Sequence, residues 1–372
     1  LHYLGLAEAF DSVYGSSAGS MIGAYFVSRQ LGGIGVYHAV LPAAGTKFID
    51  KRKLLATLGV PNRFATNDVF NLDYLLHEVM ASSQQFDYDT FAANNAVQPL
   101  HILTSRLDPV EAVVLSSEAG NFKDLSTLLR CIRASMLVPG VTGPLMALRL
   151  GDTAPVQVPY PQRRGAQERP AVAGLVADAL LTEPLPYRSA ARDGCTHVMV
   201  LRTRPDPSPT VLKGEGSVYE KVIAKRCLQR YGHQKAAHFM VEQGHVYTYA
   251  EDMLATTAGN RGANHSCTAH LLTIAPPAGC TEVQQLETGR AEILAGMRDG
   301  AAQVLEVFGL AMNIPPECFG WMLEDMLPWA DNMARVTTNA NYMETCVQES
   351  GHRYEPLFTP EASAGAGAEE EE

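Results

Sequence analysis

The sequence has little basic charge and no close pair of cysteines. Lys and Arg number 29 against 40 Asp and Glu, a formal net charge of −11, and leaving out the four Glu of Glu369–Glu372 still gives −7. A chain without an overall basic field is not expected to bind nucleic acid. The seven cysteines are scattered and include no Cys-x-x-Cys pair. This spacing argues against a disulfide scaffold and against a structural zinc site.

Long apolar runs and cofactor motifs are absent as well. Ser12–Ser28 and Gln30–Thr46 carry no formal charge over 17 residues each. Both contain Ser and Gly, and both are shorter than the roughly 20 strongly apolar residues of a membrane-spanning helix, so no such helix is predicted. The sequence has no Walker loop, Rossmann fingerprint or His-Glu-x-x-His motif. Neither a nucleotide cofactor nor a catalytic metal ion is therefore expected.

The composition is that of a globular protein, with 46% apolar and 19% charged residues among 372. Over about the first 200 residues, short apolar runs alternate with helical patterns, which predicts an α/β sheet with helices on its faces. Expected strands are Phe10–Tyr14, His101–Thr104, Ala112–Leu115, His197–Leu201 (a buried one) and Leu271–Ile274. Expected helices are Ala18–Gln30, Leu125–Met136 and Glu287–Phe308. The apolar stripe of the last helix predicts that it packs against the sheet.

The segment between the first expected strand and helix carries a chemical motif. Its residues Gly15, Ser16, Ser17, Ala18 and Gly19 have the pattern Gly-x-Ser-x-Gly, which in this context is typical of a nucleophile elbow. A serine on so sharp a turn has a strained backbone, and its neighbours must be small for the turn to close. The following helix directs its positive end and free amides toward a developing oxyanion. Ser17 is therefore the predicted nucleophile, and a glycine turn without catalytic role is the alternative.

A serine nucleophile needs a base. A triad would use a late histidine, and the candidates are His233, His238, His245, His265, His270 and His352. None of them lies in a recognisable signature. Elsewhere in the sequence, Asp178 ends an apolar, strand-like run and precedes a Leu-rich, Pro-containing turn and a further strand that ends in Arg204-Pro205.

This combination resembles the patatin-like phospholipases, which use a Ser-Asp dyad. Further stretches resemble the bacterial and plastid-type branches of that family: Leu6–Phe10, Phe48–Asp50, Arg133–Val141 and Ile274–Leu286. The likeness extends from Leu1 to about Gly309. It implies a three-layer α/β fold with a mostly parallel central sheet, Ser17 as nucleophile and Asp178 as base. It also implies hydrolysis of ester bonds in acyl lipids, without a cofactor or metal, through an acyl-serine intermediate.

The sequence departs from the family pattern in two places. The family usually has Asp-Gly-Gly or Asp-Gly-Ala, whereas Asp178 is followed by Ala179 and Leu180. The family's first strand and its glycine-rich oxyanion loop precede a helix like Leu1–Phe10, so we expect both to be missing from this sequence. The amide of Ala18 is then the remaining expected oxyanion donor. These departures favour an alternative, a catalytically impaired lipid-binding relative of the same fold.

Basicity of Asp178 is expected to come from burial. A solvated carboxylate with a pKa of about 4 is a poor base for a serine hydroxyl. Burial beside Val176, Leu180 and Leu181 would raise that pKa, and a direct hydrogen bond would orient proton transfer. Transfer of the acyl group to another alcohol would use the same residues.

The chain is expected to divide into four parts. Residues 1–205 form the predicted catalytic domain, residues 206–310 a helical portion packed on it, residues 311–360 an extension, and residues 361–372 a disordered acidic tail. The expected partners are acyl lipids of a membrane or lipid droplet. The basic triplet Lys51–Lys53 could meet anionic head groups, although a solvated helix start explains it as well.

Overall fold

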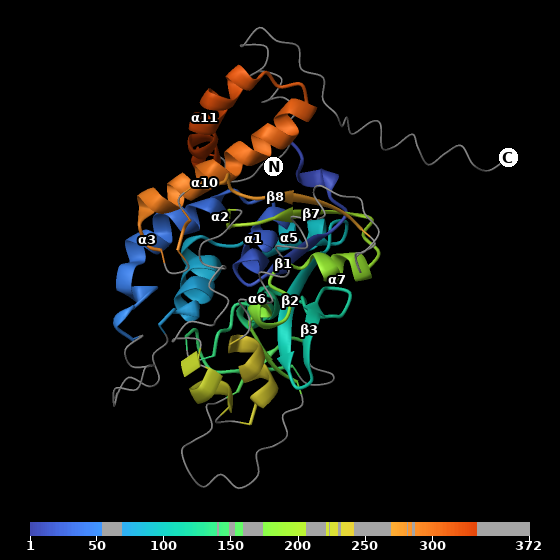
Figure 1. Ribbon diagram of the computed structural model, residues 1–372, viewed down its shortest axis with the longest axis vertical. Coiled ribbons are helices and arrows are strands. Elements are labelled where there is room, and N and C mark those ends of the chain that lie inside the picture. Colours follow the sequence, from blue (N-terminus) through green and yellow to red (C-terminus); the bar gives the residue numbers. More distant parts are fainter. Residues whose placement is uncertain are drawn as a thin grey trace, which may run out of the picture.

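The computed structural model describes residues 1–53, 69–139, 141–148, 153–158, 174–205, 221–222, 224–229, 232–241, 269–280, 282–284 and 287–332. The fold is mixed α/β, built on a six-stranded sheet (Figure 1). Its strands are β1 (Val13–Ser16), β2 (Leu100–Leu107), β3 (Val110–Leu115), β4 (Met146–Ala147), β5 (Val156–Gln157) and β6 (Leu175–Ala177). Strand β2 is central, because it pairs with β1, β3 and β6.

The strand directions differ from the sequence-based prediction. Within this sheet only β1 and β2 run parallel, whereas β2 is antiparallel to both β3 and β6, and β4 is antiparallel to β5 and β6. The connection from β2 to β3 consists only of Asp108 and Pro109, and so short a turn can join only antiparallel strands. The sheet is therefore mixed, and a mostly parallel central sheet is not confirmed.

The helices and turns are assigned as follows. The first half of the chain has η1 (Ala7–Ala9), α1 (Ala18–Val27), α2 (Gly32–Gly35), η2 (Val36–Val40), α3 (Leu41–Ala44), η3 (Gly45–Lys47), η4 (Tyr74–Ser83), α5 (Tyr88–Asn95) and α6 (Leu125–Ser135). The second half has η5 (Ala179–Leu181), α7 (Tyr187–Arg192), η7 (Ala224–Leu228), α10 (Arg290–Val304), η9 (Leu305–Gly309), η10 (Pro316–Cys318) and α11 (Phe319–Asn332). The predicted helices Ala18–Gln30 and Leu125–Met136 are confirmed as α1 and α6, with ends that differ by at most a few residues.

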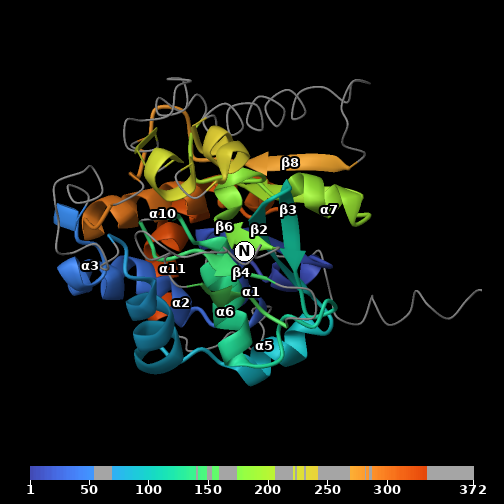
Figure 2. The ribbon, with the colours of Figure 1, turned by 90° about the horizontal axis from the view of Figure 1, so that it is seen from below.

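Helices α1 and α6 cover one face of the sheet. Strand β2 presents Leu100 and Ile102 to them, and both side chains are fully buried. The helical spacing of α6 places Leu128 and Ile132 on its buried side, as the sequence predicts. Figure 2 shows α1, α5 and α6 on one side of β2 and β4, and α7 with β8 on the other. Other elements therefore lie on both sides of the central strand.

Two further strands form a separate sheet. Strands β7 (His197–Leu201) and β8 (His270–Ile274) pair in parallel over all five residues. Both were expected as strands, but the expectation that His197–Leu201 is buried is wrong. His197 and Leu201 are exposed and only Val200 is buried in β7, because α7 covers a single face of this small sheet.

The C-terminal helices pack on one another and on the N-terminal residues. Tyr3 and Leu4 lie in one apolar cluster with Met312, Ile314 and Met322, and Figure 1 shows α10 and α11 beside the N-terminus. Helix α10 contacts η2 and α11 and has no fully buried residue. The predicted packing of its apolar stripe against the sheet is therefore wrong, since the stripe faces other helices.

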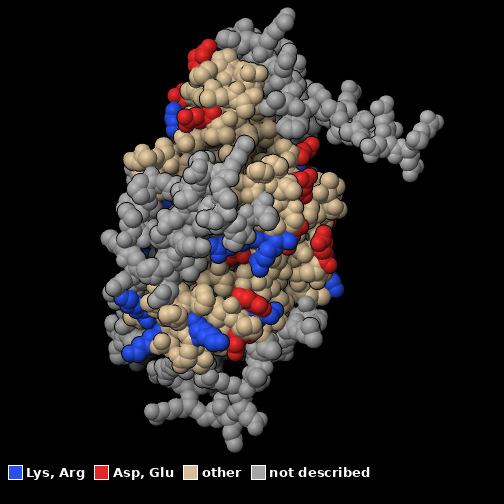
Figure 3. All heavy atoms as spheres, turned by 45° about the vertical axis from the view of Figure 1, so that its right-hand side comes forward, with Lys and Arg blue, Asp and Glu red and all other residues tan. Residues whose placement is uncertain are grey.

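The described surface and helices add two observations. On the face seen in Figure 3, Lys and Arg side chains lie among Asp and Glu side chains. Within the described ranges, every helix is too short or too polar to cross a bilayer. The predicted acidic tail at 361–372 lies outside the described residues.

Candidate active site

The register of the sheet brings Ser17 and Asp178 together. Strand β3 pairs with one edge of β2 along Ile102–Leu107. Strands β1 and β6 each pair with part of the same stretch of β2, so both must lie along the opposite edge of β2. On that edge β1 runs parallel to β2 and ends at Ser16, opposite Leu103, whereas β6 runs antiparallel and ends at Ala177, opposite Ser105. The two strands approach each other end to end. The next residue of each, Ser17 and Asp178, reaches the position beside Thr104.

Ser17 occupies the strained turn that an elbow requires. It lies between β1 and α1 with φ 52° and ψ −125°, a region that residues other than glycine rarely adopt. Its carbonyl oxygen accepts hydrogen bonds from Ser20, at 2.9 Å from the amide and 2.6 Å from the hydroxyl. Its amide donates to the hydroxyl of Ser135 over 2.8 Å. The peptide groups on both sides of Ser17 are therefore held.

Ser17 and Asp178 are in direct contact. The Ser17 hydroxyl donates to Asp178 Oδ2 over 2.9 Å, while Asp178 Oδ1 accepts the Leu180 amide at 2.8 Å. The amide of Asp178 donates to the carbonyl oxygen of Leu137 at 2.7 Å. The carboxylate is 4% exposed, whereas Ser17 is half-buried. Ala179 and Leu180, which follow Asp178, thus do not prevent the contact.

Burial sets the basicity of Asp178. It raises the pKa of this carboxyl to about 6, and the hydrogen bonds from Leu180 and Ser17 lower it by smaller amounts. Val176 and Leu181, two of the apolar residues predicted to lie beside Asp178, are buried. Charged side chains on the surrounding elements have other partners: Arg133 with Asp73, Glu183 with Ser189 and Arg192, and Arg106 with Glu111. The carboxylate is therefore a base suited to neutral pH.

The raised pKa predicts a pH-dependent gain in stability for Asp178→Asn. A carboxyl whose pKa is about 6 when folded and 3.8 in its ordinary state contributes stability below pH 4, and this is lost as the pH rises through 6. The asparagine cannot ionise. The free energy of unfolding of the Asp178→Asn variant minus that of wild type should therefore increase by about 2–3 kcal/mol between pH 4 and pH 8.

Urea unfolding of both proteins at several pH values measures this difference. Asp11→Asn, at an exposed position, is the control and should track wild type. A difference between Asp178→Asn and wild type that stays constant with pH would contradict a burial-raised pKa.

The other motif residues have distinct surroundings. Ser16 donates its hydroxyl to the carbonyl oxygen of Glu183 over 2.8 Å, which ties the end of β1 to the segment after η5. A Cβ on Gly15 would lie 2.6 Å from the carbonyl oxygen of Gly19, whereas a Cβ on Gly19 would meet nothing within 4 Å. Ala18 is exposed. The turn therefore requires glycine at 15 but not at 19, which corrects the expectation that every flanking residue must be small.

No histidine within the described ranges bonds to either member of this pair. His270 stacks on His197 with ring centroids 4.8 Å apart, and His238 is exposed on the helix of residues 234–241. His233 precedes that helix, and its amide donates to the carbonyl oxygen of Leu228. The remaining candidates His245, His265 and His352 lie outside the described residues.

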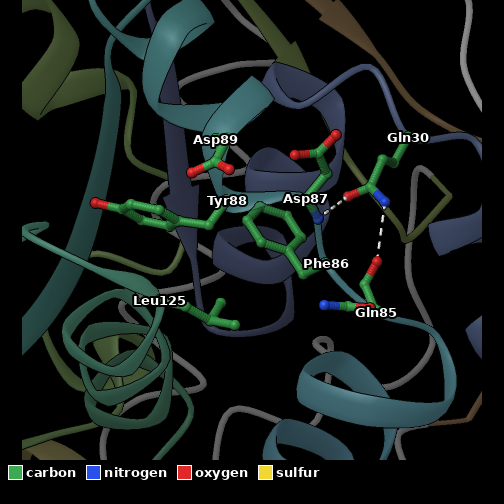
Figure 4. Close-up of a pocket in the computed structure, with 7 residues that line it drawn as sticks. All are labelled: Gln30, Gln85, Phe86, Asp87, Tyr88, Asp89 and Leu125. Atoms are coloured by element: carbon green, nitrogen blue, oxygen red, sulfur yellow. Dashed lines mark hydrogen bonds between the residues drawn. The ribbon is translucent and has the colours of Figure 1, made fainter.

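A hollow of about 380 Å³ lies at the opposite end of α1 from Ser17. It is lined by Gln30, Gln85, Phe86, Asp87, Tyr88, Asp89 and Leu125 (Figure 4). The side chain of Gln30 already has hydrogen-bond partners there. It accepts a hydrogen bond from the Asp87 amide at 2.8 Å and donates one to the Gln85 carbonyl oxygen at 3.1 Å. With a rise of about 1.5 Å per residue, α1 separates this hollow from Ser17 by roughly 15 Å. The hollow is therefore not part of the candidate active site.

Two polar residues of the site were missed from the sequence, Thr104 and Ser135. Both are fully buried, on β2 and at the end of α6. The stretch Arg133–Val141 contributes to the family resemblance, but nothing in it indicates contact with Ser17. Contacts between residues far apart in the chain, such as Ser135 and Ser17 at a separation of 118 residues, leave no local pattern in a single sequence.

No family model matches this chain, and no curated protein matches it. The atoms themselves define the chemistry that the site can carry. Ser17 offers a hydroxyl already bonded to a buried carboxylate, at the start of a ten-residue helix. No group of three or more His, Cys, Asp or Glu suited to a metal ion occurs among the described residues. The hydrogen-bonded serine and carboxylate suit acyl transfer through a serine.

Proposed function

We propose that this protein is a serine acyl hydrolase of the patatin-like kind, with the three-layer fold of that family, and that it cleaves ester bonds of acyl lipids. The observation that carries the proposal is the 2.9 Å hydrogen bond from Ser17 to Asp178, made by a serine with φ 52° in a strand-to-helix turn. A serine held this way beside a base is the arrangement that nucleophilic catalysis needs.

Acylation begins with proton transfer to the buried carboxylate. Ser17 Oγ attacks the carbonyl carbon of the substrate ester while its proton passes to Asp178 Oδ2. The carbonyl oxygen becomes an oxyanion in the tetrahedral intermediate. When the intermediate collapses, the ester C–O bond breaks and the leaving alcohol takes the proton from Asp178. The product of this half is an acyl-Ser17 ester and a free alcohol.

Deacylation repeats the same steps with water. Asp178 accepts a proton from a water molecule as the water oxygen attacks the acyl carbon. Collapse of the second tetrahedral intermediate breaks the bond to Ser17 Oγ, which recovers the proton from Asp178, and the carboxylic acid leaves. An alcohol in place of water would give acyl transfer by the same route.

The amides at the start of α1 are the oxyanion donors that these residues can supply. The Ser17 amide is bonded to Ser135 and cannot serve. The amide of Ala18, in the first turn of α1, belongs to the set that has no partner within its helix. It also lies at the positive end of the helix dipole.

An apolar surface beside Ser17 supports an acyl lipid as substrate. Ala18 is exposed, and Ile22, one turn further along α1, is 50% exposed. Both side chains lie on the helix that begins beside Ser17, and the acyl chain of a lipid bonded to Ser17 would contact them in this proposal. Contact with the surface of a membrane or lipid droplet would bring such a substrate to the site.

Labelling with a fluorophosphonate probe tests the proposal. The probe should modify Ser17 of the wild-type chain, as located by peptide mass spectrometry, and should not modify Ser17→Ala. Ser16→Ala retains the nucleophile and should still be labelled, so it is the matched control.

Two outcomes oppose the proposal. Equal labelling of wild type and Ser17→Ala would show that another residue reacts. Absence of both labelling and ester hydrolysis in the wild type would favour a non-catalytic lipid-binding protein.

A further inference from the structure

The end of α6 holds the backbone of both site residues. Ser135, the last residue of α6, is fully buried, and its hydroxyl accepts the Ser17 amide over 2.8 Å. Two residues later the carbonyl oxygen of Leu137 accepts the Asp178 amide over 2.7 Å. Ser17 and Asp178 are 161 residues apart in the chain, and one three-residue segment contacts both.

Strand β2 braces the same segment. The hydroxyl of Thr104 lies 2.7 Å from the carbonyl oxygen of Ala177 and 3.2 Å from that of Ala134. Thr104 is fully buried. The residues immediately before Asp178 and before Ser135 are thus connected through one side chain of the central strand. This polar brace fixes α6 relative to the end of β6.

We propose that Ser135 is a positioning residue for the Ser17–Asp178 pair, acting through the amide of Ser17. The inference rests on the proposed function. A strained residue keeps its conformation only where its surroundings over-determine it. Ser20 fixes the peptide group after Ser17, through two hydrogen bonds to its carbonyl oxygen, and Ser135 fixes the peptide group before it. Loss of the second restraint lets the Ser17 hydroxyl move away from Asp178.

Substitution of Ser135 should reduce the chemical step. In the full chain, Ser135→Ala removes the acceptor and should lower kcat for a short-chain p-nitrophenyl ester by about 10- to 100-fold, because small displacements at a reacting centre cost factors of this size. KM should change little, since Ser135 is buried away from the substrate. Ser135→Cys conserves size but offers only a weak acceptor, and it should lower kcat in the same direction.

The pH profile separates positioning from loss of folded protein. The hydrogen bond from Ser17 helps to lower the pKa of Asp178, so weakening it should move the acid limb of kcat/KM to higher pH. Loss of folded protein alone scales the profile without moving it. Ser28→Ala is the matched control, because Ser28 is also fully buried and donates to a backbone carbonyl, that of Tyr25, at the far end of α1.

Each outcome has a distinct meaning. The proposal is overturned if Ser135→Ala and Ser135→Cys, compared at equal folded fraction, lose no more activity than Ser28→Ala and keep the wild-type acid limb. If Ser135→Ala does not fold, Ser135→Cys alone decides by the same criteria. A wild-type chain that neither reacts with the probe nor hydrolyses esters would overturn the proposed function, and this inference with it.

Discussion

Asp178→Asn should lower kcat/KM for a short-chain p-nitrophenyl ester by about 10³- to 10⁴-fold, the size expected when a general base is removed. The asparagine oxygen can still accept the Leu180 amide, and its NH2 group can then donate to Ser17 Oγ, but a side-chain amide has no useful basicity at neutral pH. The two side chains stay in contact with donor and acceptor exchanged, while proton transfer is lost. Ser17→Ala should cost about as much, and the double variant no more, because the two residues act as a unit.

The loss of activity should accompany the rise in relative stability that the same variant is expected to show between pH 4 and pH 8. Urea unfolding shows whether the variant is folded under the conditions of the assay, and a folded but inactive variant has lost chemistry rather than structure. Steady-state rates and urea unfolding at pH 8 on one preparation measure both quantities.

Histidine variants provide the control for this assignment. His233→Gln and His238→Gln should retain most activity, since neither residue contacts Ser17 or Asp178. If one histidine substitution abolishes turnover while Asp178→Asn is mild, the base is that histidine. Such an outcome would indicate a triad and would overturn the Ser-Asp pair.

The strand-to-helix turn at Ser17 could be predicted from the sequence because its signals are local. Gly15 and Ser17 lie within three residues, between an apolar run and a helical pattern, and β1 and α1 form there. The strand begins at Val13 rather than Phe10, an ordinary difference at an element end. One determinant of Ser17's conformation, a turn closed over Gly15, is contained in that short segment.

The directions of the strands could not be predicted in this way. Apolar runs show that β2 and β6 are strands, but only pairing between distant segments makes them antiparallel. That pairing brings Asp178 to Ser17. The pair could therefore be predicted only through the family resemblance and not from the pattern of residues. No sequence pattern indicates the roles of the Thr104 and Ser135 hydroxyls, since an isolated polar residue in an apolar stretch is compatible with many roles.

The interpretation of the amphipathic helix α10 failed for a related reason. An apolar stripe predicts that a helix face is covered, but not by which element. Here η2 and α11 cover it. Similarly, β7 has the apolar composition of a buried strand, yet its sheet has only two strands and α7 on one face.

Gly15→Ala should disrupt the elbow itself. The new Cβ would lie 2.6 Å from both the carbonyl oxygen of Gly19 and Cα of Ser20, and 2.8 Å from the Ser20 amide nitrogen. These are backbone atoms of the first turn of α1, which cannot rotate away as a side chain could. Helix α1 must therefore shift from β1. Ser20 would then carry the Ser17 carbonyl with it, and the Ser17 hydroxyl would leave its position beside Asp178.

Thermal melts, urea unfolding and ester hydrolysis of Gly15→Ala and Gly19→Ala test this argument as a matched pair. Overpacking of this kind should lower the free energy of unfolding of Gly15→Ala by about 1–3 kcal/mol or more, and misplacement of Ser17 should reduce kcat/KM by at least about 100-fold. Gly19→Ala places its Cβ in open space and replaces glycine within a helix, so its stability should stay equal or rise by up to about 1 kcal/mol. Equal stability of the two variants would show that the first turn of α1 is not packed on Gly15. The close approach of helix and strand would then no longer account for the strained conformation of Ser17.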